Sequence, residues 1–144
     1  MGLRMATSEA YTVRPIGLVR STLTSRKGAP RQTYEGAPPA TLEILEEFVQ
    51  ALDGVTAGQE VVVLTWLHQA VRDVLIVRPR GDLNNPLTGV FATRSPDRPN
   101  PVGLHRVRVL SVEDRQFLRV HALEAIDGTP VIDLKSVLAC SDDA

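Results

Sequence analysis

Residues 89–103 read GVFATRSPDRPNPVG and hold the densest set of side chains that could do chemistry. Arg94, Arg98 and Asn100 stand among three prolines. Each proline fixes its own φ and removes an amide donor, so this loop is expected to be stiff. Arginine presents a planar fork of donors that matches a carboxylate or phosphate. The pattern predicts a preorganised anion site; the alternative is a structural turn with solvated arginines.

Residues 126–135 read IDGTPVIDLK and form a second candidate segment. Asp127-Gly128 is typical of a tight turn. Asp133 and Lys135 are two residues apart, so on a strand they share a face and can pair. A plain turn followed by a surface ion pair is the alternative. His68 follows a strand-like run, where a single histidine is more often structural than catalytic.

Several common templates for chemistry are missing from the sequence. It contains no glycine-rich dinucleotide fingerprint, no P-loop and no G-x-S-x-G elbow. One cysteine and three scattered histidines cannot form a zinc cluster, and Cys140 alone cannot form an internal disulfide. We therefore predict no metal and exclude a disulfide scaffold.

Strand signals dominate the elements that must hold these loops. Glu60–Leu67 and Asp73–Val77 are continuous and β-branched, as in strands buried on both faces. The further strand-like stretches are 13–19, 89–93, 102–112, 117–123 and 131–138. Short strands with proline and glycine turns predict a mainly β, single-domain, mostly antiparallel β-barrel with one short helix.

The one helical stretch is predicted over about Leu45–Leu52. Apolar residues recur at three- and four-residue spacing from Leu42 to Leu52, and Asp53-Gly54 resembles a helix end. The letters TLEIL at 41–45 alternate, so they could instead form a strand.

The composition fits one folded domain. The chain has 144 residues, 43% of them hydrophobic, which argues against disorder. Its apolar runs are far shorter than the roughly 18 residues of a membrane span. Residues 1–12 and 139–144 are predicted to be tails around a domain at 13–138. The first residues show no apolar leader, so we expect a cytoplasmic protein.

The net charge of −1 hides alternating bands along the chain. Residues 1–34 hold six Lys and Arg against one acid, and residues 71–108 hold seven against three. Residues 35–70 hold six acids and no base, and residues 109–144 hold seven acids against three bases. The overall balance therefore does not exclude a polyanionic partner, but any basic surface must be local.

From about Arg14 to Leu138 the sequence resembles the TsaA-like family, also called TrmO-like. The motifs that carry the resemblance are RPIGLVRS, PRQ at 30–32, ALDGV at 51–55, WLHQ at 66–69, GVFATRSPDRPNPVGL at 89–104 and DGTPVIDLK at 127–135. The resemblance implies a non-Rossmann β-barrel that uses S-adenosylmethionine. It further implies a homodimer with the cofactor near the subunit interface. The implied activity is N6-methylation of threonylcarbamoyladenosine beside the anticodon of tRNA.

The resemblance also implies which residues act. The expected cofactor contacts are Arg31, Gln32, Thr33, His68, Gln69, Arg94, Leu104, Ile126, Asp127, Gly128 and Thr129. Substrate contacts are expected from Arg98, Asn100 and Lys135. A general base would help an amine lose its proton, and the candidates are His68, Asp127 and Asp133. A pairing with Lys135 would make Asp133 a poor base.

The sequence also departs from the family pattern. After Asp-Leu-Lys the family usually continues Pro-Tyr, whereas Ser136-Val137 stand here. A stacking aromatic is thus missing at this position, and the extra C-terminal domain of longer members is not expected. Two alternatives stay open: a methyltransferase of the same fold that acts on a small molecule, and a non-catalytic S-adenosylmethionine-binding module.

Overall fold

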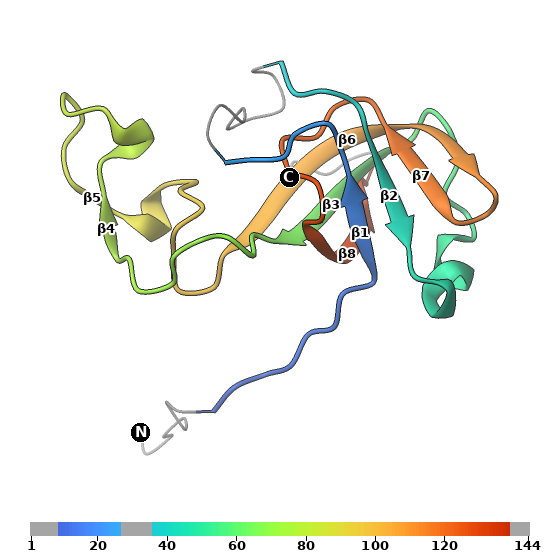
Figure 1. Cartoon of the computed structure of the whole chain (residues 1–144), viewed down its shortest axis with the longest axis horizontal. Helices are drawn as coiled ribbons and strands as arrows, with labels where there is room; N and C mark the ends of the chain where they lie inside the picture. The colour runs from blue at the N-terminus through green and yellow to red at the C-terminus, as the bar shows by residue number, and fades with distance from the viewer. Residues whose placement is uncertain (1–8, 27–35, 139–144) are drawn as a thin grey trace.

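The computed structural model describes residues 9–26 and 36–138. Six antiparallel strands close into a barrel in the order β1-β2-β7-β6-β3-β8 (Figure 1). The barrel closes because β1 pairs with β2 on one side and with β8 on the other. The barrel strands are β1 Gly17–Arg20, β2 Ala40–Ile44, β3 Glu60–Trp66, β6 Val102–Glu113, β7 Phe117–Val120 and β8 Pro130–Ser136. The predicted antiparallel, mainly β fold is confirmed.

Alternating side chains of these strands fill the barrel with an apolar core. The pairing of β3 with β6 sets Val61 opposite Val107 and Val63 opposite His105. The buried core side chains include Val19, Leu42, Ile44, Val61, Val63, Val107, Val109, Leu118, Val120 and Val131. Val62 is buried as well, as the continuous β-branched run predicts.

The predicted helix is present at the expected place but differs in type. Residues Glu46–Leu52 form a 3-10 helix, η2, whose Leu52 is buried. Asp53 ends η2, and Gly54 follows with φ of 94°. Residues 40–44 form β2, so the strand alternative for TLEIL is confirmed. The segment is a strand and not a helix because β2 lies between β1 and β7, where its alternating apolar side chains face the core.

Between β3 and β6 the chain leaves the barrel and forms an arm, residues 67–101. The arm contains a two-stranded sheet of β4, Ile76–Val77, and β5, Thr88–Gly89, with 3-10 helices η3 at Pro79–Gly81 and η4 at Val90–Ala92. Figure 1 shows it to the left of the barrel. The prediction that 73–77 forms a strand buried on both faces is wrong, since only Ile76 and Val77 pair and Leu75 and Ile76 are exposed.

The predicted short strand at 89–93 is also wrong. Only Gly89 of this stretch lies in a strand, β5, and Val90–Ala92 turn into η4. Within the described residues, no helix is both long and apolar enough to cross a membrane. The predicted tail 139–144, and residues 1–8 of the other tail, lie outside the described residues.

Candidate functional site

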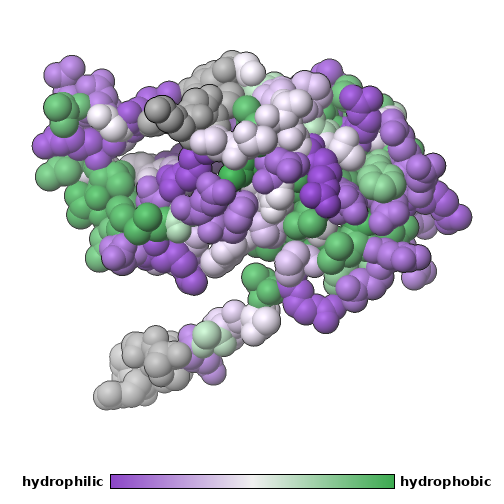
Figure 2. Space-filling view, viewed as in Figure 1, coloured by the Kyte–Doolittle hydropathy of each residue, from purple (hydrophilic) through white to green (hydrophobic). Residues whose placement is uncertain are grey.

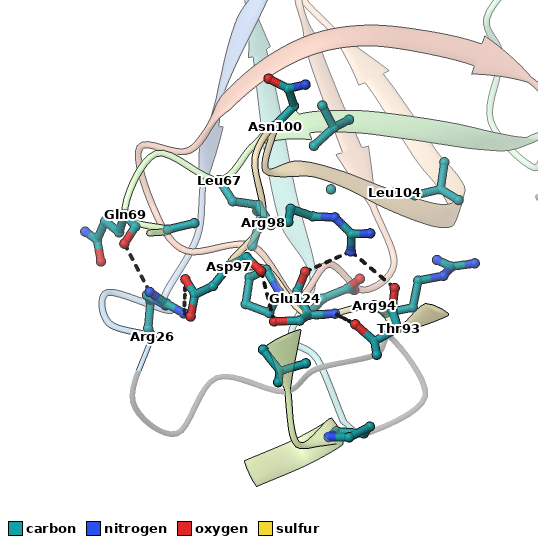
Figure 3. Close-up of a pocket in the computed structure, with 18 of the residues that line it drawn as sticks. Arg26, Leu67, Gln69, Thr93, Arg94, Asp97, Arg98, Asn100, Leu104 and Glu124 are labelled. Carbon is teal, nitrogen blue, oxygen red and sulfur yellow. Dashed lines mark hydrogen bonds and ion pairs between the residues drawn. The ribbon is translucent and has the colours of Figure 1, made fainter. Parts of the chain in front are cut away.

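A pocket of about 1180 Å³ lies between the arm and the end of the barrel where β3 finishes and β6 begins (Figure 3). Gly103 contributes from the barrel side, and Leu67, Thr93 and Ser95 from the arm. The predicted site residues that line this pocket are His68, Gln69, Arg94, Arg98, Asn100, Leu104, Ile126 and Thr129. The fold thus brings together three segments that are separate in the sequence: 66–69, 89–104 and 126–129.

Other predicted site residues lie elsewhere. Asp127, Gly128, Asp133 and Lys135 are not among the residues that line the pocket. Arg31, Gln32 and Thr33 lie outside the described residues.

Arg26, the last residue described before that segment, belongs to the pocket wall. Its guanidinium donates to the carbonyl oxygen of Gln69 over 3.0 Å and pairs with the Asp97 carboxylate at 3.1 Å. Figure 3 shows both contacts as dashed lines. Arg26 therefore connects Gln69 of the WLHQ sequence to Asp97 of the proline-rich loop.

Two arginines hold the proline-rich loop in shape. Arg98 donates to the backbone carbonyl oxygens of Val90, Thr93 and Ser95 over 2.9, 3.2 and 2.9 Å. Arg72 donates to the Pro99 carbonyl over 2.7 Å and to the Asn100 side chain over 2.9 Å. The loop is therefore stiffened by guanidinium bonds as well as by its prolines. These contacts occupy Arg98 and Asn100, which were expected to bind substrate.

Arg94 differs from these arginines. Its side chain is exposed and lines the pocket, and within the described part of the chain its guanidinium makes no hydrogen bond or ion pair. His68 is exposed at the same pocket. A free guanidinium on a loop fixed by other residues is well placed to receive an anionic group.

The charge lining the pocket is mainly positive. The arginines in the lining are Arg26, Arg78, Arg80, Arg94 and Arg98, whereas the acids are Asp97 and Glu124. Arg26 comes from the positive band 1–34 and the other arginines from the band 71–108. The two bands that are separate in the sequence thus meet at one pocket.

The pocket wall also holds a buried polar group that no sequence motif indicated. The Nδ1 atom of His105 lies 2.6 Å from Glu124 Oε1, and its Nε2 atom lies 2.7 Å from Thr65 Oγ1. The side chains of His105 and Glu124 are only 5% and 9% exposed. The strand period could have revealed His105, because it falls on the core face between Gly103 and Val107 and so needs a buried partner.

Gly103 makes room for this group. A Cβ atom at Gly103 would lie 2.3 Å from Thr65 Oγ1 and 2.7 Å from His105 Nε2. Both distances are shorter than ordinary contacts, so any larger residue would displace the hydroxyl or the imidazole. The glycine in the sequence NPVGL is thus explained by space rather than by an unusual backbone angle.

Asp127 and Asp133 have structural partners outside the pocket. The Asp127 carboxylate accepts the Ser21 amide over 3.0 Å, and Gly128 of the same turn has φ of 83°. Asp133 pairs with Lys135 at 3.3 Å, which confirms the predicted ion pair. These contacts leave His68 as the one earlier base candidate that faces the pocket.

An ion pair on the barrel wall shifts the pKa values of both of its members. A hydrogen bond from Arg106, aided by its charge, lowers the pKa of the Glu60 carboxyl below its usual range. The same contact raises the pKa of Arg106. Among the described residues, no three His, Cys, Asp or Glu side chains are grouped to hold a metal ion.

A closed antiparallel barrel with a basic pocket under a fixed loop defines a small β-barrel ligand-binding domain. The family model described as "tRNA-methyltransferase O N-terminal domain" matches residues 18–143. The chain therefore belongs to this family, as the sequence motifs indicated.

Relatives of known name support this assignment. A probable S-adenosyl-L-methionine-binding protein of Methanothermobacter thermautotrophicus is 46% identical over 123 residues, covering 85% of this chain and 87% of that protein. An S-adenosyl-L-methionine-binding protein of Archaeoglobus fulgidus is 42% identical over 123 residues, covering 85% and 86%.

The fold resembles solved structures of the same family. The crystal structure of TrmO from Pseudomonas aeruginosa superposes with a TM-score of 0.73 at 32% identity, covering 94% of this chain and 61% of that chain. Across three solved TrmO structures, this chain spans 58–62% of the matched chain's length.

Proposed function

We propose that this protein is an S-adenosylmethionine-dependent methyltransferase that methylates N6 of threonylcarbamoyladenosine beside the anticodon of tRNA. The observation that carries the proposal is the basic pocket, with its exposed Arg94, in a chain that matches the tRNA-methyltransferase family over residues 18–143. The names of the relatives, which are S-adenosylmethionine-binding proteins, support the choice of cofactor.

The side chains of the pocket fit that cofactor. Arg94 would receive the α-carboxylate with its guanidinium fork. Leu104 and Ile126 are apolar lining residues that would cover the adenine face, and His68 and Gln69 offer polar groups beside them. The pocket is larger than the roughly 300–1,000 Å³ usual for one small ligand, so it has room for an acceptor base as well.

The cofactor supplies a methyl group on a positively charged sulfur. The chain's own part is to hold the two reactants in line, and such positioning supplies much of the catalysis in transfer reactions. Arg98 and Arg72 serve this purpose indirectly, because they fix the loop from which Arg94 projects.

An RNA acceptor is supported by charge and by one aromatic. Five arginines against two acids in the lining favour a phosphate-rich partner. Phe91 also lines the pocket and is 81% exposed, so a base can stack on its ring. We propose that Phe91 takes over the stacking that the missing Pro-Tyr sequence after Lys135 would provide.

We further propose that the protein is a homodimer that joins through the arm. Leu75, Ile76, Leu83 and Leu87 are large apolar side chains of the arm and are all exposed. Figure 2 shows apolar residues gathered over β4 and β5. A second copy is the proposed occupant, because the family resemblance implies a dimer with the cofactor near the interface and the arm forms one wall of the pocket.

The proposed activity is tested by nucleoside mass spectrometry of tRNA from a strain that lacks this gene. We expect the methylated threonylcarbamoyladenosine to disappear and to return when the gene is restored. Purified protein with S-adenosylmethionine should then methylate the mutant tRNA, with a rate that falls as salt rises. Unchanged nucleosides, with intact cofactor binding by calorimetry, would favour a small-molecule acceptor instead.

A further inference from the structure

Asn100 lies near the end of the proline-rich loop, and Arg72 holds its side-chain amide in one orientation. Arg72 Nη2 donates to Asn100 Oδ1 over 2.9 Å, and Arg72 Nε donates to the Pro99 carbonyl oxygen over 2.7 Å. Building on the proposed methyl transfer, we propose that Asn100 Nδ2 donates a hydrogen bond to an oxygen of the threonylcarbamoyl group of the methyl acceptor. Asn100 is then a specificity-determining residue, and Arg72 is a positioning residue.

The contact with Arg72 determines which way the amide faces. A guanidinium offers only N–H donors, so it can bond the oxygen of the amide but not its nitrogen. A flipped amide would bring N–H groups against N–H groups and lose the bond. The Asn100 nitrogen therefore faces away from Arg72 with both of its hydrogens, and the contact with Arg72 uses only the oxygen.

Arg72 is itself held from the barrel side. Its Cζ atom lies 5.0 Å from the centroid of the ring of Trp66, the last residue of β3. Trp66 pairs with Val102 of β6, whose amide donates to the Asn100 carbonyl oxygen over 2.8 Å. The backbone and the side chain of Asn100 are thus both connected to the ends of these two strands. A donor that is fixed before the ligand arrives loses little freedom on binding.

The Asn100 nitrogen has no hydrogen-bond partner among residues 9–26 and 36–138, and Asn100 is exposed where it lines the pocket. Holding the loop does not require an amide, because the carboxylate of an aspartate would bond Arg72 more strongly through its opposite charge. What asparagine adds is a neutral side chain with two N–H groups that Arg72 does not use.

These N–H groups suit the acceptor better than the cofactor. Figure 3 shows Asn100 and Arg94 at different ends of the group of labelled side chains, so Asn100 is separate from the proposed anchor of the cofactor carboxylate. The threonylcarbamoyl group presents a carbonyl oxygen and a carboxylate, and both accept from an N–H group. Plain adenosine lacks these oxygens, so a contact at Asn100 would distinguish modified from unmodified tRNA.

The test is Asn100→Asp, which keeps an oxygen for Arg72 and replaces the two N–H groups with a second oxygen. Fluorescence anisotropy compares two anticodon stem-loop RNAs that differ only in carrying threonylcarbamoyladenosine or adenosine. We expect the preference of wild type for the modified RNA to fall about 10–100-fold in the variant. Affinity for S-adenosylmethionine, measured by calorimetry, should stay within about twofold, because Asn100 does not contact the cofactor in this proposal.

Asn84→Asp is the matched control. It adds the same negative charge to the arm, but Asn84 is not among the residues that line the pocket. General weakening of RNA binding by the added charge should appear in both variants and with both RNAs. Only Asn100→Asp should reduce the preference for the modified RNA.

Arg72→Lys tests the positioning role. Lysine keeps the positive charge but lacks the planar fork that fixes the amide. We expect a smaller loss of the preference for the modified RNA, and no further loss when Arg72→Lys is combined with Asn100→Asp. Two losses that simply add would contradict positioning through Asn100.

Other results would overturn the proposal. They are a wild type or an Asn100→Asp variant that contradicts the expected preference, or a variant whose defect is confined to cofactor binding. If Asn100→Asp fails to fold, Asn100→Ala takes its place and should lose the same preference, because alanine also lacks the N–H groups. Wild-type protein that binds S-adenosylmethionine but methylates no tRNA would overturn the proposed function itself. An active wild type with an equally active Asn100→Asp variant would overturn only this inference.

Discussion

The arginines around the pocket have different tasks, although the sequence presents them as one type. Arg98 and Arg72 bond to backbone carbonyls, and Arg26 bonds to a carbonyl and a carboxylate. Arg94 has no such contact among the described residues. A guanidinium that is already bonded contributes to the shape of the loop, whereas a free one can bind a ligand.

Arg94→Ala should therefore weaken binding without weakening the fold. Hydrogen bonds to charged groups contribute roughly 1.5–3 kcal/mol, so we expect S-adenosylmethionine affinity to fall about 10–100-fold by calorimetry. The thermal midpoint should hardly move because the side chain is exposed. Arg119→Ala, on the outer face of β7, is the matched control. Unchanged affinity in Arg94→Ala would remove this residue from the cofactor site.

At this scale the sequence predicted much of the pocket and missed its buried centre. Residues such as His68, Arg94 and Leu104 belong to recognisable motifs, and the fold gathers them. Glu124 lies in an ordinary apolar stretch of the sequence. Its described partner, His105, is 19 positions away. The two residues meet because the chain runs back beside β6 through β7, and a linear pattern does not contain that contact.

At the scale of elements, Arg98 holds the proline-rich loop in shape through its hydrogen bonds to backbone carbonyls. Arg98→Ala removes the bonds to three carbonyls and leaves those oxygens less satisfied. We expect the free energy of unfolding in urea to fall by roughly 1–3 kcal/mol. Cofactor binding should also weaken, because the loop that carries Arg94 is no longer held in one conformation. Loss of affinity with full stability would instead indicate that Arg98 contacts the ligand directly, as the sequence resemblance implies.

The pairing of β3 with β6 includes a pH-dependent contact. Arg106 lowers the pKa of Glu60, so this contact stabilises the fold above the usual glutamate range and is lost as pH falls through the lowered value. Glu60→Gln should therefore unfold at lower urea than wild type at neutral pH, and the difference should shrink as pH falls below the usual glutamate range. The effect should be small and should shrink with salt, because both side chains are exposed. If the stability difference between Glu60→Gln and wild type persists in acid, its cause is packing and not the ion pair.

The barrel strands were more predictable than the arm. The run 60–67 and the run 73–77 look alike in sequence, yet β3 pairs on both sides and β4 has one short partner. A β-branched run shows that a segment can be a strand but not what will cover it. The apolar spacing predicted a helix at this place but not its 3-10 type. That type belongs to a short connection between β2 and β3, which the spacing does not describe.

For the molecule as a whole, the fold places the two positive charge bands of the sequence beside one pocket. The chain is nearly neutral, but arginines from two separate bands converge on one pocket. Local convergence lets a protein with a net charge of −1 attract a polyanion to one place.

The exposed apolar face of the arm leads to the last prediction. Leu87 is 63% exposed, and a charge there would have to be buried in the proposed dimer. Leu87→Glu should therefore weaken the dimer by at least about tenfold in sedimentation velocity, since an unpaired buried charge is costly. Leu110→Glu, on β6 and outside the arm, is the control and should remain dimeric. A dimeric Leu87→Glu variant would exclude this face.

Cofactor binding by the same variant then tests how the pocket is completed. The arm forms one wall of the pocket, so an interface on its outer face would hold that wall in place. If the cofactor lies near the interface, the monomeric Leu87→Glu variant should bind S-adenosylmethionine more weakly, and affinity should recover at protein concentrations that restore the dimer. A monomer with full affinity would show that one chain alone completes the pocket.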